Sequence, residues 1–185
     1  MELAHASFIG PLYACGSQAR GRVARTGFHM SVPVPLRILL IEDNSLDAEL
    51  MLCELRKAGF ETHAVIADTR ESFTNLLSPD FDLILCDHAL PQFSSKIALE
   101  MVRERALDVP FIIVSGTISE PNAVNAMKNG ADDYLIKDRI ERLGQAAIRA
   151  IERRRMRGEI RKAEGAFREI DARFERLSEK LKKLV

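Results

Sequence analysis

The sequence is short of three things: cysteines, long apolar runs and net charge. Its three cysteines, Cys15, Cys53 and Cys86, have no metal-ligand spacing, and an odd number of scattered thiols is typical of a reducing compartment, so we expect a cytoplasmic protein. No uninterrupted apolar run approaches the roughly 18 residues that a transmembrane helix requires, so we expect no membrane partner. Lysine plus arginine and aspartate plus glutamate each total 27, and this balance by itself indicates no nucleic-acid partner.

The charge is distributed unevenly along the 185 residues. From Ile38 to Asp138 the sequence has 8 basic and 18 acidic residues, a net charge of −10, whereas Arg139 to Val185 has 15 and 8, a net charge of +7. We therefore expect three parts: a disordered arm over residues 1–35, a globular domain over 36–155 and a coiled-coil helix over 156–185. The arm lacks a continuous apolar core of signal-peptide length; a translation start at Met30 or a transit peptide would equally account for its lack of pattern.

Short apolar runs alternate with amphipathic stretches between residues 36 and 137, as they do in parallel sheets with crossover helices. We expect five strands, at residues 37–41, 62–66, 81–86, 111–114 and 134–136. We expect helices between them, at residues 46–58, 69–77, 95–106 and 119–130, the first and last stopped by Gly59 and Gly130. Because strand-helix-strand crossovers are right-handed, this order predicts a doubly wound α/β domain with a five-stranded parallel sheet.

Functional groups stand where the predicted strands end. They are Glu42 and Asp43 after the first strand, Asp87 after the third, Ser115 after the fourth and Lys137 after the fifth. Ligands bind beyond the carboxyl ends of the strands in doubly wound sheets. Three carboxylates that converge there repel one another unless a cation screens them, and Mg²⁺ prefers such oxygen ligands and commonly bridges them to a phosphoryl group. The sequence therefore predicts a magnesium site for phosphoryl transfer, with Lys137 and Ser115 holding phosphoryl oxygens.

Together these segments resemble the response-regulator receiver family of two-component signalling. The resemblance extends over about two thirds of the chain and rests on residues 41–44, 85–87, 114–117 and 134–137. It implies a flavodoxin-like sheet with the strand order 2-1-3-4-5, and a cognate histidine kinase or phosphotransfer protein as the donor of the phosphoryl group. It also implies a phosphoprotein that is not an enzyme beyond self-phosphorylation and autodephosphorylation.

The same resemblance assigns a role to each acidic residue. Asp87 is the expected phosphoacceptor and a metal ligand, Asp43 is expected to bind Mg²⁺ directly, and Glu42 is expected to act on it mainly through water. The backbone carbonyl of Ala89 is the expected third protein ligand. We expect His88, next to the acceptor, to be a surface residue rather than a general base, because neighbouring strand residues point to opposite faces.

Ser115 and Tyr134 resemble the switch pair of the family, which reports phosphorylation to the face formed by the fourth helix, fifth strand and fifth helix. Three other positions depart from the family pattern. Asp138 follows the site lysine where the family has a cis-proline, and we expect no cis bond there because a non-proline cis peptide costs about 2.5–4 kcal/mol. Gln92 and Ser95 stand where glycines are common, so we expect the loop after the acceptor to be less permissive of positive φ.

From residue 156 onward, apolar residues recur at alternating intervals of four and three. They are Met156, Ile160, Ala163, Phe167, Ile170, Phe174, Leu177, Leu181 and Leu184. About four heptads of this pattern predict a coiled coil. Because an isolated helix would leave the stripe in water, we expect it to pair in a homodimer or to pack on a further helix. The segment is basic but has no groove-reading motif, so we do not expect it to bind nucleic acid.

Three other interpretations stay open at this point. A non-phosphorylated coiled-coil scaffold would keep the fold without using Asp87. Residues 114–120, 136–139 and 161–177 resemble hybrid sensor kinases and PAS-containing regulators, so the chain also fits the N-terminal fragment of a hybrid sensor histidine kinase. A hydrolase of the aspartyl-phosphate type is disfavoured, because Ala89 stands where such an enzyme has a second aspartate.

Overall fold

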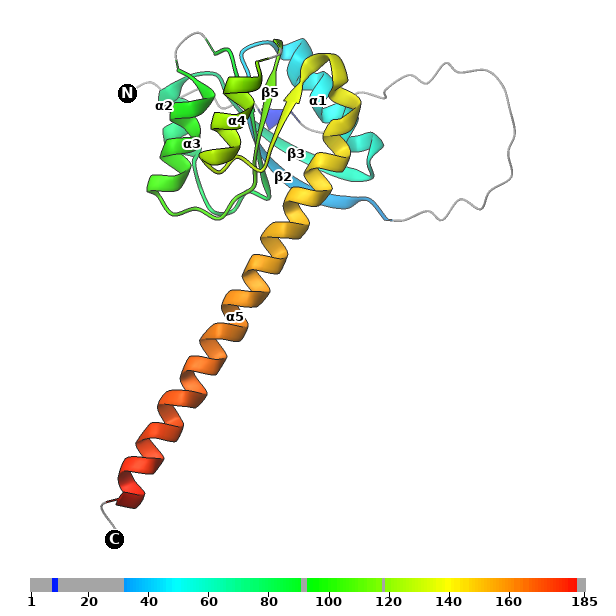
Figure 1. Cartoon of the computed structure of the whole chain (residues 1–185). Helices are drawn as coiled ribbons and strands as arrows, with labels where there is room; N and C mark the ends of the chain where they lie inside the picture. Colours follow the sequence, from blue (N-terminus) through cyan, green and yellow to red (C-terminus); the bar gives the residue numbers. More distant parts are fainter. Residues whose placement is uncertain (1–7, 10–31, 91–92, 118, 183–185) are drawn as a thin grey trace, which may run out of the picture. The chain divides into compact units, whose positions relative to one another are not determined.

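One mixed sheet organises the part of the chain that the computed structural model describes, namely residues 8–9, 32–90, 93–117 and 119–182. Its strands are β1 (Phe8–Ile9), β2 (Val34–Ile41), β3 (Phe60–Ala67), β4 (Leu83–Asp87), β5 (Phe111–Ser115) and β6 (Asp133–Ile136). Their order is β1-β3-β2-β4-β5-β6. Figure 1 labels β2, β3 and β5 of this sheet. The strands β2 to β6 pair in parallel, so the five-stranded parallel sheet with the order 2-1-3-4-5 is confirmed.

The edge strand β1 was not predicted. Phe8 and Ile9 pair antiparallel with Val65 and Ala64 of β3, inside the segment that we expected to be a disordered arm. A strand of two residues has no periodicity, and its pairing is fixed by a distant partner, so the local sequence carries no signal for it. Residues 1–7 and 10–31 of the expected arm lie outside the described residues, and its last two residues, Val34 and Pro35, belong to β2.

Helices follow most of the parallel strands, and three of those described begin at a residue whose side chain caps them. They are α1 (Ser45–Lys57), α2 (Arg70–Leu76), α3 (Ser95–Glu104), α4 (Glu120–Lys128), the 3₁₀ helix η1 (Lys137–Arg142) and α5 (Leu143–Lys182). The side chain of Asn44 accepts a hydrogen bond from the backbone N–H of Leu46 at 3.0 Å, which caps α1. Gly59 and Gly130 both have φ of 95° after α1 and α4, as expected of residues that stop helices.

Two apolar clusters lie on the two faces of the sheet. One cluster joins the sheet to α1 and the start of α5, through Ile38, Leu40, Leu85, Met51, Leu55, Leu143 and Ala147. The other joins it to α2 and α3, through Leu39, Ile41, Ile84, Phe73, Leu99 and Val102. Alternate residues of β2 thus enter different clusters, which is why its apolar run is continuous. The central strands are buried on both faces, and their carboxyl ends carry the polar residues described below.

The chain divides into two units, residues 1–151 and 152–185. The second unit consists, in the described residues, of the part of α5 that runs from Glu152 to Lys182. Met156, Ile160, Phe167, Ile170 and Phe174 are between 59% and 71% exposed on it. Leu177, Leu181 and Leu184 of the predicted stripe are positions whose side chains lie outside the description. Among the described helices, none combines the length and the apolarity that crossing a membrane demands.

Candidate functional site

Three carboxylates meet at the carboxyl ends of the central strands. Glu42 directly follows β2, Asp43 is the next residue, and Asp87 is the last residue of β4. One oxygen from each of the three lies within 4.8 Å of the others. Glu42 and Asp87 are almost fully buried, whereas Asp43 is exposed. The structure therefore brings together the three acidic residues that the sequence singled out, because parallel strands end at one edge of the sheet.

Lys137 reaches into this cluster from the end of β6. Its Nζ lies 3.1 Å from an Oε of Glu42 and 3.2 Å from an Oδ of Asp87. The predicted convergence of a lysine with the acidic residues is thus present. No cis peptide bond occurs among the described residues, so the bond from Lys137 to Asp138 is trans, as the sequence predicted in the absence of proline.

Asp47 is a site residue that the sequence analysis missed. Its Oδ2 lies 2.6 Å from Nζ of Lys137, which is the shortest contact that this ammonium makes with a carboxylate. Asp47 stands in the first turn of α1, where an acidic residue is common because of the helix dipole. A usable signal existed nonetheless: the helix starts at the edge of the sheet where the site lies, so its first turn is near the ends of the strands.

Burial and the neighbouring charged groups have opposing effects on the pKa of each buried group in the site. Burial raises the pKa of Glu42 above its ordinary value, although hydrogen bonds from the Asn44 backbone and Lys137 oppose the rise. Burial by itself lowers the pKa of Lys137, but hydrogen bonds to Asp47 and Glu42 and the charge of Asp87 outweigh it and raise this pKa above its ordinary value. Lys137 is therefore a permanent ammonium at neutral pH, shared among several carboxylates.

The donor set fits a hard divalent cation. Carboxylate oxygens are the ligands that Mg²⁺ prefers, and the single ammonium of Lys137 leaves the negative charge of Glu42, Asp43 and Asp87 only partly neutralised. Ala89 is exposed next to this cluster, and its backbone N–H donates to Oδ1 of Asp87 at 3.4 Å. The geometry that holds the Asp87 carboxylate thus comes partly from the loop that was expected to supply a backbone ligand.

Ser115 and Tyr134 lie on neighbouring strands, at the end of β5 and within β6. Ser115 is buried; its hydroxyl donates to the carbonyl of Thr117 at 3.1 Å and accepts from the N–H of that residue at 3.3 Å. The hydroxyl of Tyr134 is buried without a hydrogen-bond partner among the described residues. The two hydroxyls are therefore in different situations, one engaged by the following loop and one without an internal bond.

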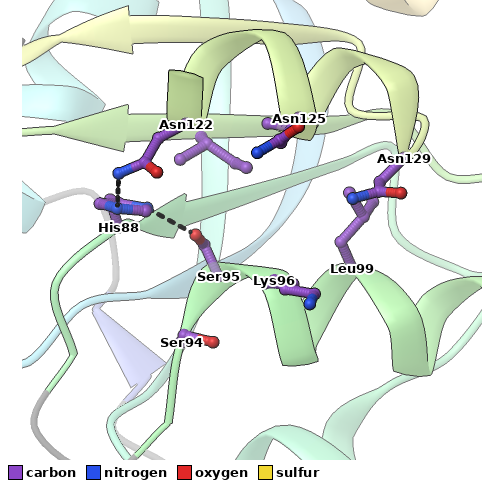
Figure 2. A pocket seen from close by; sticks show the side chains of 10 residues that line it. His88, Ser94, Ser95, Lys96, Leu99, Asn122, Asn125 and Asn129 are labelled. Carbon is purple, nitrogen blue, oxygen red and sulfur yellow. Dashed lines mark hydrogen bonds between the residues drawn. The ribbon is translucent and has the colours of Figure 1, made fainter. Parts of the chain in front are cut away.

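His88, immediately after Asp87, joins two helices (Figure 2). Its Nδ1 lies 2.9 Å from Oγ of Ser95 at the start of α3, and its Nε2 lies 3.1 Å from Nδ2 of Asn122 on α4. It is half-buried and borders a cavity of about 260 Å³. Both ring nitrogens are engaged, and the contact accounts for a serine where the family commonly has glycine. Gln92 lies outside the described residues.

The buried thiol of Cys86 belongs to the core and not to the reactive part of the site. Cys86 is fully buried in the cluster with Ile84 and Phe111. Burial, together with the nearby carboxylates of Asp87 and Glu42, raises the pKa of this thiol. It is therefore held as a neutral thiol and packs as a small core residue.

Comparisons with known proteins agree with this geometry. The cell cycle transcriptional regulator CtrA of Caulobacter vibrioides is 35% identical over 103 residues, which are 55% of this chain and 44% of that protein. The chain spans about half the length of the curated relatives it matches, which include the transcriptional regulatory proteins QseB of Haemophilus influenzae and DltR of Streptococcus agalactiae. The similarity thus covers about half of each of these relatives.

Solved structures are similar over the same region. A response regulator receiver domain protein from Clostridium thermocellum has a TM-score of 0.57 and 26% identity, and covers 65% of this chain and 98% of that one. The beryllofluoride-activated NtrC4 receiver domain dimer has a TM-score of 0.54 and 28% identity, with 64% and 98% covered. The profile of the response regulator receiver domain matches residues 38–149. The chain belongs to the response regulator receiver family.

Proposed function

We propose that this chain is a response-regulator module that accepts a phosphoryl group on Asp87, in a Mg²⁺-dependent reaction, from a histidine of a cognate histidine kinase or phosphotransfer protein. The observation that carries the proposal is the position of Asp87. Its carboxylate is buried, lies within 4.8 Å of the carboxylates of Glu42 and Asp43, and is 3.2 Å from the ammonium of Lys137. A nucleophilic carboxylate between a cation site and an ammonium suits phosphoryl transfer.

The residues of the site would divide the work as follows. Asp43, Asp87 and the backbone carbonyl of Ala89 would hold Mg²⁺, with Glu42 acting through water. The ion supplies neutralisation of the negative charge that gathers when a phosphoryl group meets the carboxylates. A carboxylate oxygen of Asp87 forms the new bond to phosphorus, the bond from phosphorus to the donor nitrogen breaks, and its electron pair stays on the donor imidazole. Lys137 then holds a phosphoryl oxygen.

Ser115 and Tyr134 are the proposed switch. In the structure the Ser115 hydroxyl is bound to the Thr117 backbone, and the Tyr134 hydroxyl lacks an internal partner. On phosphorylation the Ser115 hydroxyl would turn to a phosphoryl oxygen, which exchanges one hydrogen bond for a stronger, charge-assisted one. The released Thr117 segment would then move, and the Tyr134 hydroxyl would be able to form a hydrogen bond. The face near α4 and β6 would thereby read the state of Asp87.

We further propose that the exposed stripe of α5 pairs with a second copy of the chain as a coiled coil. Five of its apolar side chains are at least 59% exposed, which is unusual for residues such as Phe167 and Phe174. The heptad spacing keeps the stripe on one side of the helix. The output would be a change in this pairing, with a protein partner in the cytoplasm rather than nucleic acid. The likeness to hybrid sensor kinases and PAS-containing regulators stays a prediction about the wider protein.

The proposed acceptor is tested by phosphorylating the full chain with Mg²⁺ and acetyl phosphate and measuring the intact mass. We expect the gain of one phosphoryl group, lost on Asp87→Asn and on chelation of the metal. Asp80→Asn is the matched control, because Asp80 is an exposed turn residue that bonds Ser78. An unmodified wild-type mass, with unchanged self-association, would instead support a scaffold that does not use phosphorylation.

A further inference from the structure

We infer that Asp47 is a positioning residue: it holds the ammonium of Lys137 beside the cluster of Glu42, Asp43 and Asp87 and so keeps that cluster available to a divalent cation. The inference rests on the proposed Mg²⁺-dependent function. Its starting point is that Lys137 contacts three carboxylates, and that the closest one, at 2.6 Å, belongs to Asp47 on α1.

Lys137 and a bound cation compete for the same oxygens. Glu42 and Asp87, which the ammonium contacts at 3.1 and 3.2 Å, are also members of the carboxylate cluster. A divalent cation at that cluster repels an ammonium that stays in contact with both acids. Lys137 must therefore weaken these two contacts when a cation binds, and its remaining contact decides whether it stays in the site.

Asp47 supplies that remaining contact because it lies outside the cluster. Its carboxylate bonds Lys137 without being among the three residues grouped within 4.8 Å. The ammonium can then lose its contacts with Glu42 and Asp87 while it keeps one anionic partner. Cation binding therefore costs less Coulomb energy than it would without the Asp47 carboxylate. Lys137 also stays within the site for a phosphoryl oxygen.

A purely structural role for Asp47 is a poorer account. An acidic residue in a first turn stabilises a helix by its charge, but the cap of α1 is already made by Asn44, whose side chain accepts from Leu46. The neighbouring acid on the same helix shows the alternative: Glu49 pairs with Arg56 of α1 itself. Asp47 instead bonds a residue 90 positions away in the sequence.

The test is a calorimetric titration of the full chain with Mg²⁺ alone, without any phosphodonor. We expect Asp47→Asn to raise the Kd for Mg²⁺ by about threefold to tenfold, because Lys137 then neutralises Glu42 and Asp87 only. Asp47→Glu should recover most of the affinity. Glu49→Gln, which removes a carboxylate paired with Arg56, should change the Kd by less than about twofold. An unchanged Kd in Asp47→Asn overturns the inference.

A double-mutant cycle separates the proposed route from simple loss of negative charge. In a Lys137→Met background there is no ammonium to hold, so the effect of Asp47→Asn on the Kd should fall to less than about half. If Asp47 acts only through space, the effect in that background is as large or larger, since the carboxylate is no longer neutralised. That result would contradict the inference.

Phosphorylation gives a second, separate measure. In Asp47→Asn the Mg²⁺ concentration that half-saturates labelling by acetyl phosphate should rise with the Kd, while the rate at saturating Mg²⁺ stays within about twofold. If the wild-type chain is labelled and Asp47→Asn binds Mg²⁺ normally, only this inference fails. If the wild-type chain binds Mg²⁺ but is never labelled, the proposed function fails, and the calorimetric result still decides the role of Asp47.

Discussion

The first turns of helix α5 and its exposed stretch share one secondary structure and have opposite surroundings. Leu143, Ala146, Ala147 and Ala150 are completely buried in the cluster that also contains α1. Phe167, by contrast, is 71% exposed. Apolar residues of the first stretch are thus buried, whereas large apolar residues of the second are exposed to water. The first stretch is held by contacts within the chain, and the second carries the exposed stripe for which we propose pairing with a second copy.

The largest effect is expected from removing the exposed stripe. Replacing Phe167, Ile170 and Phe174 together by serine should weaken self-association by at least about a hundredfold, since burying each such side chain contributes about 1.5–3 kcal/mol. Sedimentation equilibrium of the variant should show a monomer at concentrations where the wild-type chain is a dimer. Serine at the exposed polar positions Glu169 and Arg173 is the control and should leave the dimer intact. A dimeric triple variant would place the interface elsewhere.

The next effect concerns the buried stretch. Leu143→Ala should lower the free energy of unfolding by about 2–5 kcal/mol, because Leu143 has no exposed surface and its removal leaves a cavity. Ile160→Ala, on the exposed stretch, should change it by less than about 0.5 kcal/mol. Urea denaturation at protein concentrations below the dimer Kd measures both. Equal losses would mean that the two stretches do not differ as their exposure indicates.

Two glycines of α5 sharpen the contrast because the same substitution should act with opposite sign. A Cβ on Gly144 would lie 2.5 Å from Cβ of Ala58, so Gly144→Ala should destabilise the chain by about 1–3 kcal/mol. A Cβ on Gly158 meets nothing within 4 Å, so Gly158→Ala should stabilise the helix by up to about 1 kcal/mol. Urea denaturation compares the two variants, and a stabilised Gly144→Ala would show that α1 can shift aside.

Much of this architecture was predictable because it depends on local sequence patterns. The apolar runs such as 38–41 and 111–114 predict strands, and parallel pairing then brings the residues at their carboxyl ends to one edge of the sheet. The five strands and the meeting of three acids with Lys137 follow from these two facts. The coiled-coil interpretation of residues 156–185 rests on spacing alone and stays a prediction.

The parts that were missed depend on how distant elements are rotated and placed. Asp47 contacts Lys137 only because α1 presents its first turn to the end of β6, and helix spacing does not fix that rotation. The bonds of His88 to Ser95 and Asn122 likewise need two helices to approach one loop. The pairing of β1 with β3 has no local pattern behind it. The residues in each of these contacts carry no distinctive sequence pattern, and they come together only in the tertiary structure.

The smallest effect is expected at Glu42, the residue that follows β2. Burial of its carboxylate opposes stability, and β2 packs against the buried stretch of α5. Because burial raises the pKa of Glu42, the folded chain takes up this proton at a higher pH than the unfolded chain does, and the ionised form is disfavoured in the fold. Without Mg²⁺, Glu42→Gln should therefore raise the melting temperature at neutral pH. The advantage should shrink as the pH falls through the raised pKa of Glu42, since the wild-type residue then becomes neutral too. Added Mg²⁺ should raise the melting temperature of the wild-type chain more than that of the variant. A lower melting temperature for Glu42→Gln at neutral pH would mean that the ion pair with Lys137, at 3.1 Å, outweighs the cost of burying the carboxylate.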